Sequence, residues 1–265
     1  MHSNDATNLI SPSIGRRILW ISLSLLGAQL IGSAFNIWYN LSRIRPLLDA
    51  EQKEAFAAGI RYFNVIVYPI AFAIWIGIVL SISRAWKGSD PNSDHWRTAT
   101  RRMINLPWIA IGVSGAAWLL SIPVLLLAVH SATGTLDSQV NLHLPVSIIV
   151  AALISLALGF FIVEILVQKF LYPLFLKEGG AADIPGTFQI TLKRRGMIWA
   201  VSAVVCPILS LMLLFVVSGF DTKHDVWFPL SVGAVGIVFG LVSAWLQVAN
   251  RTTNPTDTAT PTEIG

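Results

Sequence analysis

The chain has 265 residues, of which 54% are hydrophobic and only 12% are charged, about half the charged share of ordinary soluble domains. Its formal net charge is +4 and its mean hydropathy is +0.67, while a single cysteine excludes an intramolecular disulfide. These values exclude a soluble disulfide-rich fold and predict a protein whose main partner is the lipid bilayer. The chain carries no nucleic-acid-binding motif, so we attribute its basic character to membrane topology and anionic lipid and expect no nucleic-acid partner.

Six apolar runs follow one another along the chain. A helix of about 20 residues spans the roughly 30 Å hydrocarbon layer, and the alternation typical of barrel strands is absent. We therefore predict an all-α polytopic membrane protein, a six-transmembrane-helix bundle over residues 18–250, between a cytoplasmic segment 1–17 and a disordered cytoplasmic tail 251–265. The predicted spans are residues 18–39, 62–83, 104–130, 145–169, 197–220 and 228–250.

Lys and Arg are unevenly divided between the two sides of these spans. Thirteen fall on one side and five on the other, so the positive-inside rule places both termini in the cytoplasm, and we expect a bacterial inner membrane. The larger group is Arg16, Arg17, Arg84, Lys87, Arg97, Arg101, Arg102, Lys169, Lys177, Lys193, Arg194, Arg195 and Arg251. The smaller group is Arg43, Arg45, Lys53, Arg61 and Lys223.

Two polar stripes mark the outer ends of the first and second predicted spans. Spacings of three or four residues place each stripe on one helical face. We expect the two stripes to face one another, either as a hydrogen-bond clasp with an aromatic belt or as a pocket for a small ligand. The ligand-binding candidates are Asn36, Asn40 and Arg43 with Tyr39 beside them, then Arg61, Asn64 and Tyr68. Between the stripes, the alternation of apolar and charged residues after Pro46 predicts an amphipathic helix on the outer surface or joining the two spans.

The third predicted span contains "GVSG", with Ser114 third, which matches the G-x-S-G of rhomboid intramembrane serine proteases. That chemistry needs a histidine on a later span to take the proton from the serine, and the last span has none. We therefore interpret these small residues as helix packing and predict no catalytic residue and no enzyme.

Histidines and carboxylates, among them His130, Asp137, His143 and His224, lie in the predicted outer loops or at span ends. Their spacing matches no known ligand motif, so we expect no metal site and no cofactor, with metal sensing as a minor alternative.

Glu164 lies in the apolar run "GFFIVEILVQKFLYPLF", near the cytoplasmic end of the fourth predicted span. The favoured interpretation is a boundary carboxylate that reaches water or pairs with basic residues. A proton or cation relay is an alternative, and so is a packing or signalling role in which Glu164, Gln168 and Tyr172 couple the bundle to the cytoplasm.

Small residues recur every four positions in the last predicted span, at Gly236, Gly240 and Ala244. The first span has the same rhythm at Ser24, Ala28 and Gly32. This spacing lets helices approach closely, and we expect packing inside the bundle, with a homodimer as the alternative.

Two stretches, "NIWYN…RPLL…EQKEAF…YFNVIVYP" (36–69) and "VEILVQKFLYPLF" (163–175), resemble the six-span membrane module of certain bacterial signalling proteins. In those proteins the module precedes a class III adenylate cyclase, a phosphatase or a kinase-type output domain. The resemblance implies no catalytic residue. Only fifteen residues follow Asn250, so any signal is expected to pass to a separate membrane or cytoplasmic partner. The resemblance also implies that eight residues mark the module: Asn36, Tyr39, Asn40, Asn64, Tyr68, Pro69, Glu164 and Pro173.

Two functions remain in view. The first is a non-enzymatic sensor-like or accessory module that binds a small apolar or amphipathic ligand, or a partner's helices. The alternative is a small-solute transporter or channel, for which Pro69, Pro123 and Pro207 would break the second, third and fifth spans.

Overall fold

The computed structural model describes residues 14–88, 90, 93–176 and 186–187, together with residues 208, 231, 233–235, 237–238, 240 and 242. The elements of this part are all helical. In chain order they are α1 (Ile14–Tyr39), the π-helix η1 (Asn40–Ile44), the 3-10 helix η2 (Arg45–Leu47), α2 (Ala50–Gly88), α3 (Asp94–Ile104), α4 (Leu106–Thr133), α5 (Ser138–Phe170) and α6 (Tyr172–Phe175).

Four of the described helical segments are long and apolar enough to cross a membrane. They coincide with the first four predicted spans, which confirms the helical, membrane-type character of this part of the chain. The fifth and sixth predicted spans and the tail lie outside the described residues. The four segments are Ile14–Leu47, Ala50–Trp86, Leu106–Thr133 and Ser138–Phe170.

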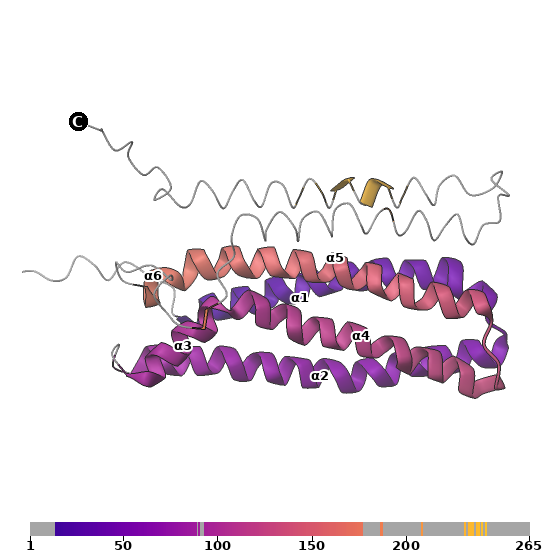
Figure 1. The fold of residues 1–265 in the computed structure, drawn as a ribbon, viewed down its shortest axis with the longest axis horizontal. Coiled ribbons are helices and arrows are strands. Elements are labelled where there is room, and N and C mark those ends of the chain that lie inside the picture. Colours follow the sequence, from indigo (N-terminus) through magenta and orange to yellow (C-terminus); the bar gives the residue numbers. More distant parts are fainter. Residues whose placement is uncertain are drawn as a thin grey trace, which may run out of the picture.

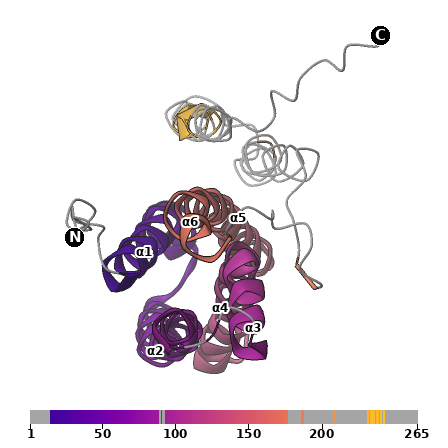
Figure 2. The ribbon, with the colours of Figure 1, turned by 90° about the vertical axis from the view of Figure 1, so that its left-hand side faces the viewer.

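The four long helices form an open arc rather than a closed ring (Figure 2). Helix α1 packs along α5, α5 along α4, and α4 along α2, whereas α1 and α2 contact each other at few points. Figure 1 shows α3 and α6 together at one end, which we call the inner end because it is predicted to be cytoplasmic. The opposite end, with η1, η2 and the α4–α5 turn, is called the outer end.

Helix α5 is the most buried of the four, because both α1 and α4 pack along it. Its contact with α1 is close at Gly32, where a β-carbon would overlap the Ser155 hydroxyl and lie 2.6 Å from the Ala151 carbonyl oxygen. The predicted packing role of Gly32 and Ala28 inside the bundle is therefore confirmed. Gly236 and Ala244 lie outside the described residues, so the same prediction for the last span stays open.

The outer end of α2 is held by a capping box. The Asp49 carboxylate accepts a hydrogen bond from the Gln52 N–H (2.8 Å), and the Gln52 side-chain oxygen accepts one from the Asp49 N–H (3.3 Å). The Gln52 amide also donates to the Thr133 hydroxyl at the end of α4 (3.0 Å). The amphipathic segment predicted between the first two spans thus forms the first turns of one continuous 39-residue helix.

An aromatic cluster closes the inner end. The rings of Trp86 in α2, Trp96 in α3 and Phe175 in α6 have centroids 4.8 to 5.7 Å apart. Pro173 cannot donate the next backbone hydrogen bond, and the chain leaves α5 two residues before it, at Leu171. This cluster fixes α3 and α6 against the long helices.

The prolines of the second and third predicted spans do not break them. Pro69 lies inside α2 and Pro123 inside α4, and both helices continue through these positions. The expected breaks are therefore wrong for these two spans, because the neighbouring turns keep their helical conformation. Pro207 lies outside the described residues.

Candidate functional site

A cavity of about 420 Å³ lies between α1, α2 and α4, on the side of the arc where α1 and α2 barely touch. This size falls within the roughly 300–1,000 Å³ usual for small-ligand sites. Its wall is mostly apolar, with aromatic side chains such as Phe56, Phe63 and Trp118. We call this cavity the groove.

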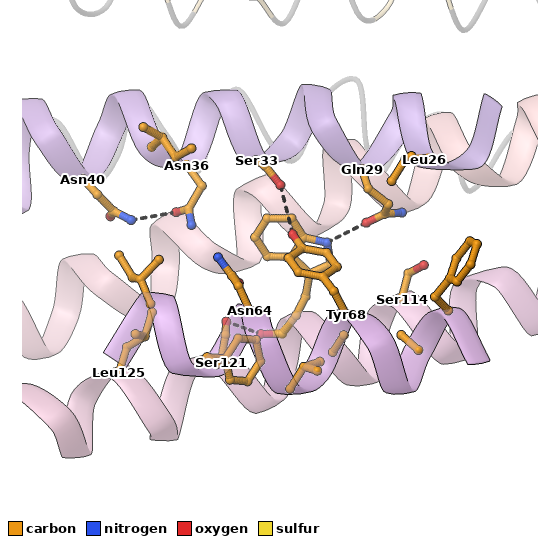
Figure 3. A pocket seen from close by; sticks show the side chains of 18 of the residues that line it. Leu26, Gln29, Ser33, Asn36, Asn40, Asn64, Tyr68, Ser114, Ser121 and Leu125 are labelled. Atoms are coloured by element: carbon orange, nitrogen blue, oxygen red, sulfur yellow. Dashed lines mark hydrogen bonds between the residues drawn. The ribbon is translucent and has the colours of Figure 1, made fainter. Parts of the chain in front are cut away.

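Amide and hydroxyl groups from all three helices interrupt this apolar wall (Figure 3). Four of the seven predicted ligand-binding residues line the groove, so the two polar stripes do share one cavity. Within it, the Asn40 amide donates to the Asn36 side-chain oxygen (3.2 Å). The polar lining includes Asn36 and Asn40 from the α1 side, Asn64 and Tyr68 from α2, and Ser114 and Ser121 from α4.

The other three predicted residues do not line the groove. Arg61 is exposed and follows Ile60, a lining residue, so it is turned about 100° around α2. Arg43 lies in the π-helix, where the Arg45 N–H bonds back five residues to the Asn40 carbonyl. Each π turn holds more residues than an α turn, so Arg43 lags behind the face that an α-helical spacing predicts.

Tyr39 faces α5 instead. Its hydroxyl lies 2.8 Å from Nδ1 of His143, and both side chains are almost completely buried, 2% and 1% exposed. This pair occupies one of the histidines that we considered for metal sensing. Within the described part of the chain, no three His, Cys, Asp or Glu side chains are grouped to hold a metal ion.

Asn40 joins the groove to the same buried region. It lines the groove, yet it is only 5% exposed, and its side-chain oxygen accepts a hydrogen bond from the Ser147 hydroxyl of α5 (3.3 Å). Asn40 therefore links the groove wall directly to α5.

Two hydrogen bonds cross the opening between α1 and α2. Near the inner end, the Trp75 indole donates to the Ser22 hydroxyl (2.9 Å). At mid-depth, the Tyr68 and Ser33 hydroxyls are 3.4 Å apart (Figure 3), which is long for a hydroxyl pair. Tyr68 is 46% exposed, so this crossing lies at the open side of the groove.

The sequence interpretation missed the deeper polar wall. Gln29 accepts a hydrogen bond from the Trp118 indole of α4 (3.0 Å), and Ser33 follows it in the groove. The signal was present, since Gln29, Ser33, Asn36 and Asn40 are spaced i, i+4, i+7 and i+11 on one helical face. The predicted stripe comprised only the outer members of this face, Asn36 and Asn40.

Two cations, Arg45 and Lys53, line the groove at its outer end. No carboxylate and no histidine stands among the described residues of its wall. From the "GVSG" stretch, Val113 and Ser114 line this wall, and none of the described lining residues is a histidine.

Glu164 lies on α5, more than four turns from Ser147 toward the inner end. Its side chain is only 3% exposed, so it does not reach water, which was one form of the favoured sequence interpretation. The other form, pairing with basic residues, stays a prediction. Gln168, one turn on, donates to its carboxylate (3.0 Å), as the four-residue spacing allows. Tyr172 begins α6 and packs against the inner-end core, so the three predicted coupling residues do lie together at this end.

No protein-family model, no curated protein and no solved structure matches the chain. The similarity to the six-span signalling module therefore stays a prediction.

Proposed function

We propose that the protein is a non-enzymatic membrane module that binds an amphipathic, lipid-like molecule in the groove and changes its helix packing when the groove is occupied. The observation that carries this proposal is the position of the groove, which opens between two helices whose outer faces are apolar. On those faces Leu30, Val65 and Ile66 are more than half exposed, as expected of lipid-facing side chains. A ligand dissolved in the bilayer would enter sideways.

The wall suits such a ligand. Aromatic and aliphatic side chains accept hydrocarbon, and a few amide and hydroxyl groups orient a polar linkage. Asn64 and Tyr68 from α2 face Asn36 and Ser33 from the α1 side (Figure 3), so a polar group of the ligand that reaches this depth would meet polar side chains on both walls.

Occupancy is passed on through α5. A ligand shifts a helix arrangement only if it binds two arrangements with different affinity. Because Asn40 contacts both the groove and Ser147, a ligand that draws Asn40 toward the groove weakens its contact with α5. Helix α5 then leads to Glu164 and Gln168 at the inner end, where a separate partner would receive the signal.

A groove-filling variant tests the binding site. Ala71 lines the groove on α2, whereas Ala73, two residues on, is exposed and does not. We expect Ala71→Phe to abolish binding of a radiolabelled monoacylglycerol to the purified protein in detergent, and Ala73→Phe to leave it unchanged. Equal binding by both variants and the wild type would place the ligand elsewhere.

Transport of a small solute is the alternative. It is separated from sensing by flux, because a transporter moves its ligand across the bilayer of reconstituted vesicles and a sensor does not. The transporter would be favoured if vesicles took up a small solute in the absence of monoacylglycerol and the Ala71→Phe variant blocked this uptake.

A further inference from the structure

Within the described part of the chain, the outer end of the groove is lined by two positive charges and no negative one. Arg45 is exposed and Lys53 is half-buried, and both line the groove. Neither forms an ion pair with a carboxylate of the described part of the chain, and the Arg97–Asp94 ion pair lies at the other end of the bundle. Two cations beside an apolar groove form a site for an anion that is attached to hydrocarbon.

The nearby carboxylates are directed elsewhere. Asp49 accepts the hydrogen bond of the capping box at the start of α2, and it does not line the groove. Glu51 and Glu54 are exposed and are also absent from the groove wall. Among its described lining residues the groove therefore presents only positive charge, although the surrounding segment carries both signs.

Both cations are held in place by the local fold. Arg45 follows the π turn and begins the 3-10 helix that Pro46 favours. Lys53 comes directly after Gln52, whose side chain bonds to the capping box and to Thr133 of α4. Their positions at the outer end of the groove thus depend on backbone that is ordered by these hydrogen bonds and helical turns.

The remaining groove suits an acyl chain in kind and is more than long enough to hold one. From Lys53 to Trp75 the wall follows 22 residues of α2, or about 33 Å at 1.5 Å per residue, which exceeds the roughly 15 Å of one leaflet's hydrocarbon. Below the cations the α2 wall is apolar at Phe56, Ile60 and Phe63. The sideways opening lets a second acyl chain stay in the bilayer.

We propose that the ligand is an anionic phospholipid, with its head group at Arg45 and Lys53 and one acyl chain in the groove. This inference rests on the proposed function, since it names the chemical class of the groove's ligand. Each cation near a membrane surface attracts anionic lipid by about 1 kcal/mol, so two of them favour an anionic over a zwitterionic head group by about tenfold or more.

The experiment is a lipid competition read by native mass spectrometry. The purified protein is given equal amounts of phosphatidylglycerol and phosphatidylcholine with identical acyl chains. We expect the wild type to retain phosphatidylglycerol at least about tenfold over phosphatidylcholine. The Arg45→Gln/Lys53→Gln variant should retain both lipids equally, because the groove stays open while its charge is lost. The control Arg61→Gln removes an exposed cation that does not line the groove, and should keep the preference.

The outcomes separate this inference from the function on which it rests. Equal retention of both lipids by the wild type, or loss of the preference in Arg61→Gln, would overturn the anionic head group while leaving a lipid-binding groove. Undiminished lipid retention by Ala71→Phe would overturn the groove itself. Binding of free palmitate with no binding of phosphatidylglycerol would replace the phospholipid by a fatty acid and overturn the proposal.

Discussion

The Ser147 hydroxyl of α5 donates a hydrogen bond to the Asn40 side-chain oxygen at 3.3 Å and also lies 2.9 Å from the Leu144 carbonyl oxygen. Its single hydrogen therefore has two acceptors, one on the groove wall and one on its own helix. A small movement of Asn40 can transfer this hydrogen to Leu144 at little cost. The contact is thus suited to pass occupancy of the groove to α5.

Ser147→Ala removes this contact and leaves the groove wall intact. We expect ligand affinity within about twofold of the wild type, because Ser147 does not line the groove. Ligand-induced changes in hydrogen exchange at the inner end should be lost. Ser131→Ala is the control and should keep the response, since Ser131 bonds to its own helix at Ala128 and does not line the groove. An unchanged response in Ser147→Ala would exclude this route.

The Tyr39–His143 pair predicts a measurable coupling energy. Tyr39→Phe leaves the buried Nδ1 of His143 without its partner, so we expect destabilisation of about 1 kcal/mol. His143→Phe should destabilise similarly, and the double variant by less than the sum of the two. Denaturant unfolding in detergent micelles measures all four corners of the cycle. Strict additivity would show that the two groups do not interact.

The close contact of α1 with α5 predicts a large effect of bulk at Gly32. Gly32→Val should destabilise the bundle by about 1–3 kcal/mol or more, because the new β-carbon would lie 2.6 Å from the Ala151 carbonyl oxygen. Gly27 is the matched control on the same helix, since a β-carbon there meets no other atom within 4 Å. Thermal unfolding should therefore separate Gly32→Val from Gly27→Val. Equal melting temperatures would contradict the packing.

Glu164 is buried beside Gln168 at the inner end, so its charge is costly to keep there. Glu164→Gln keeps the shape and one hydrogen-bond acceptor, and we expect the bundle to fold and bind ligand as before. The response at the inner end should weaken if Glu164 couples the bundle to a partner. Hydrogen exchange of α3 and α6, with and without ligand, measures this. A response identical to the wild type would leave Glu164 with a packing role.

Topology gives the broadest test. The uneven division of Lys and Arg predicts that a reporter fused after Asn250 reads cytoplasmic, and that one inserted near Asp137 reads external. Asp137 caps α5 in the turn after α4, so an insertion just before it leaves both helices intact. If the first reporter read external and the second cytoplasmic, the end of the groove called outer would face the cytoplasm.

The polar stripe shows how far the candidate site was predictable. Asn36, Asn40, Asn64 and Tyr68 were found because α-helical spacing places them on single faces, and α1 and α2 keep that spacing there. Arg43 does not line the groove, because the π turn changes the helical spacing at this point. No sequence pattern indicated Trp118 as a partner of Gln29, since they are 89 positions apart and on different helices.

The sequence by itself determined that this part of the chain forms long apolar helices, because hydropathy summed over about 20 residues depends only on neighbours along the chain. It also determined where polar groups repeat along each helix. Only the tertiary structure decided that α1 packs on α5 rather than on α2, and so left a groove between the first two helices. That choice depends on close contacts such as Gly32 with Ser155, between residues more than a hundred positions apart, which no local pattern specifies. The same packing turned Tyr39 toward His143 and left Arg45 and Lys53 at the outer end of the groove.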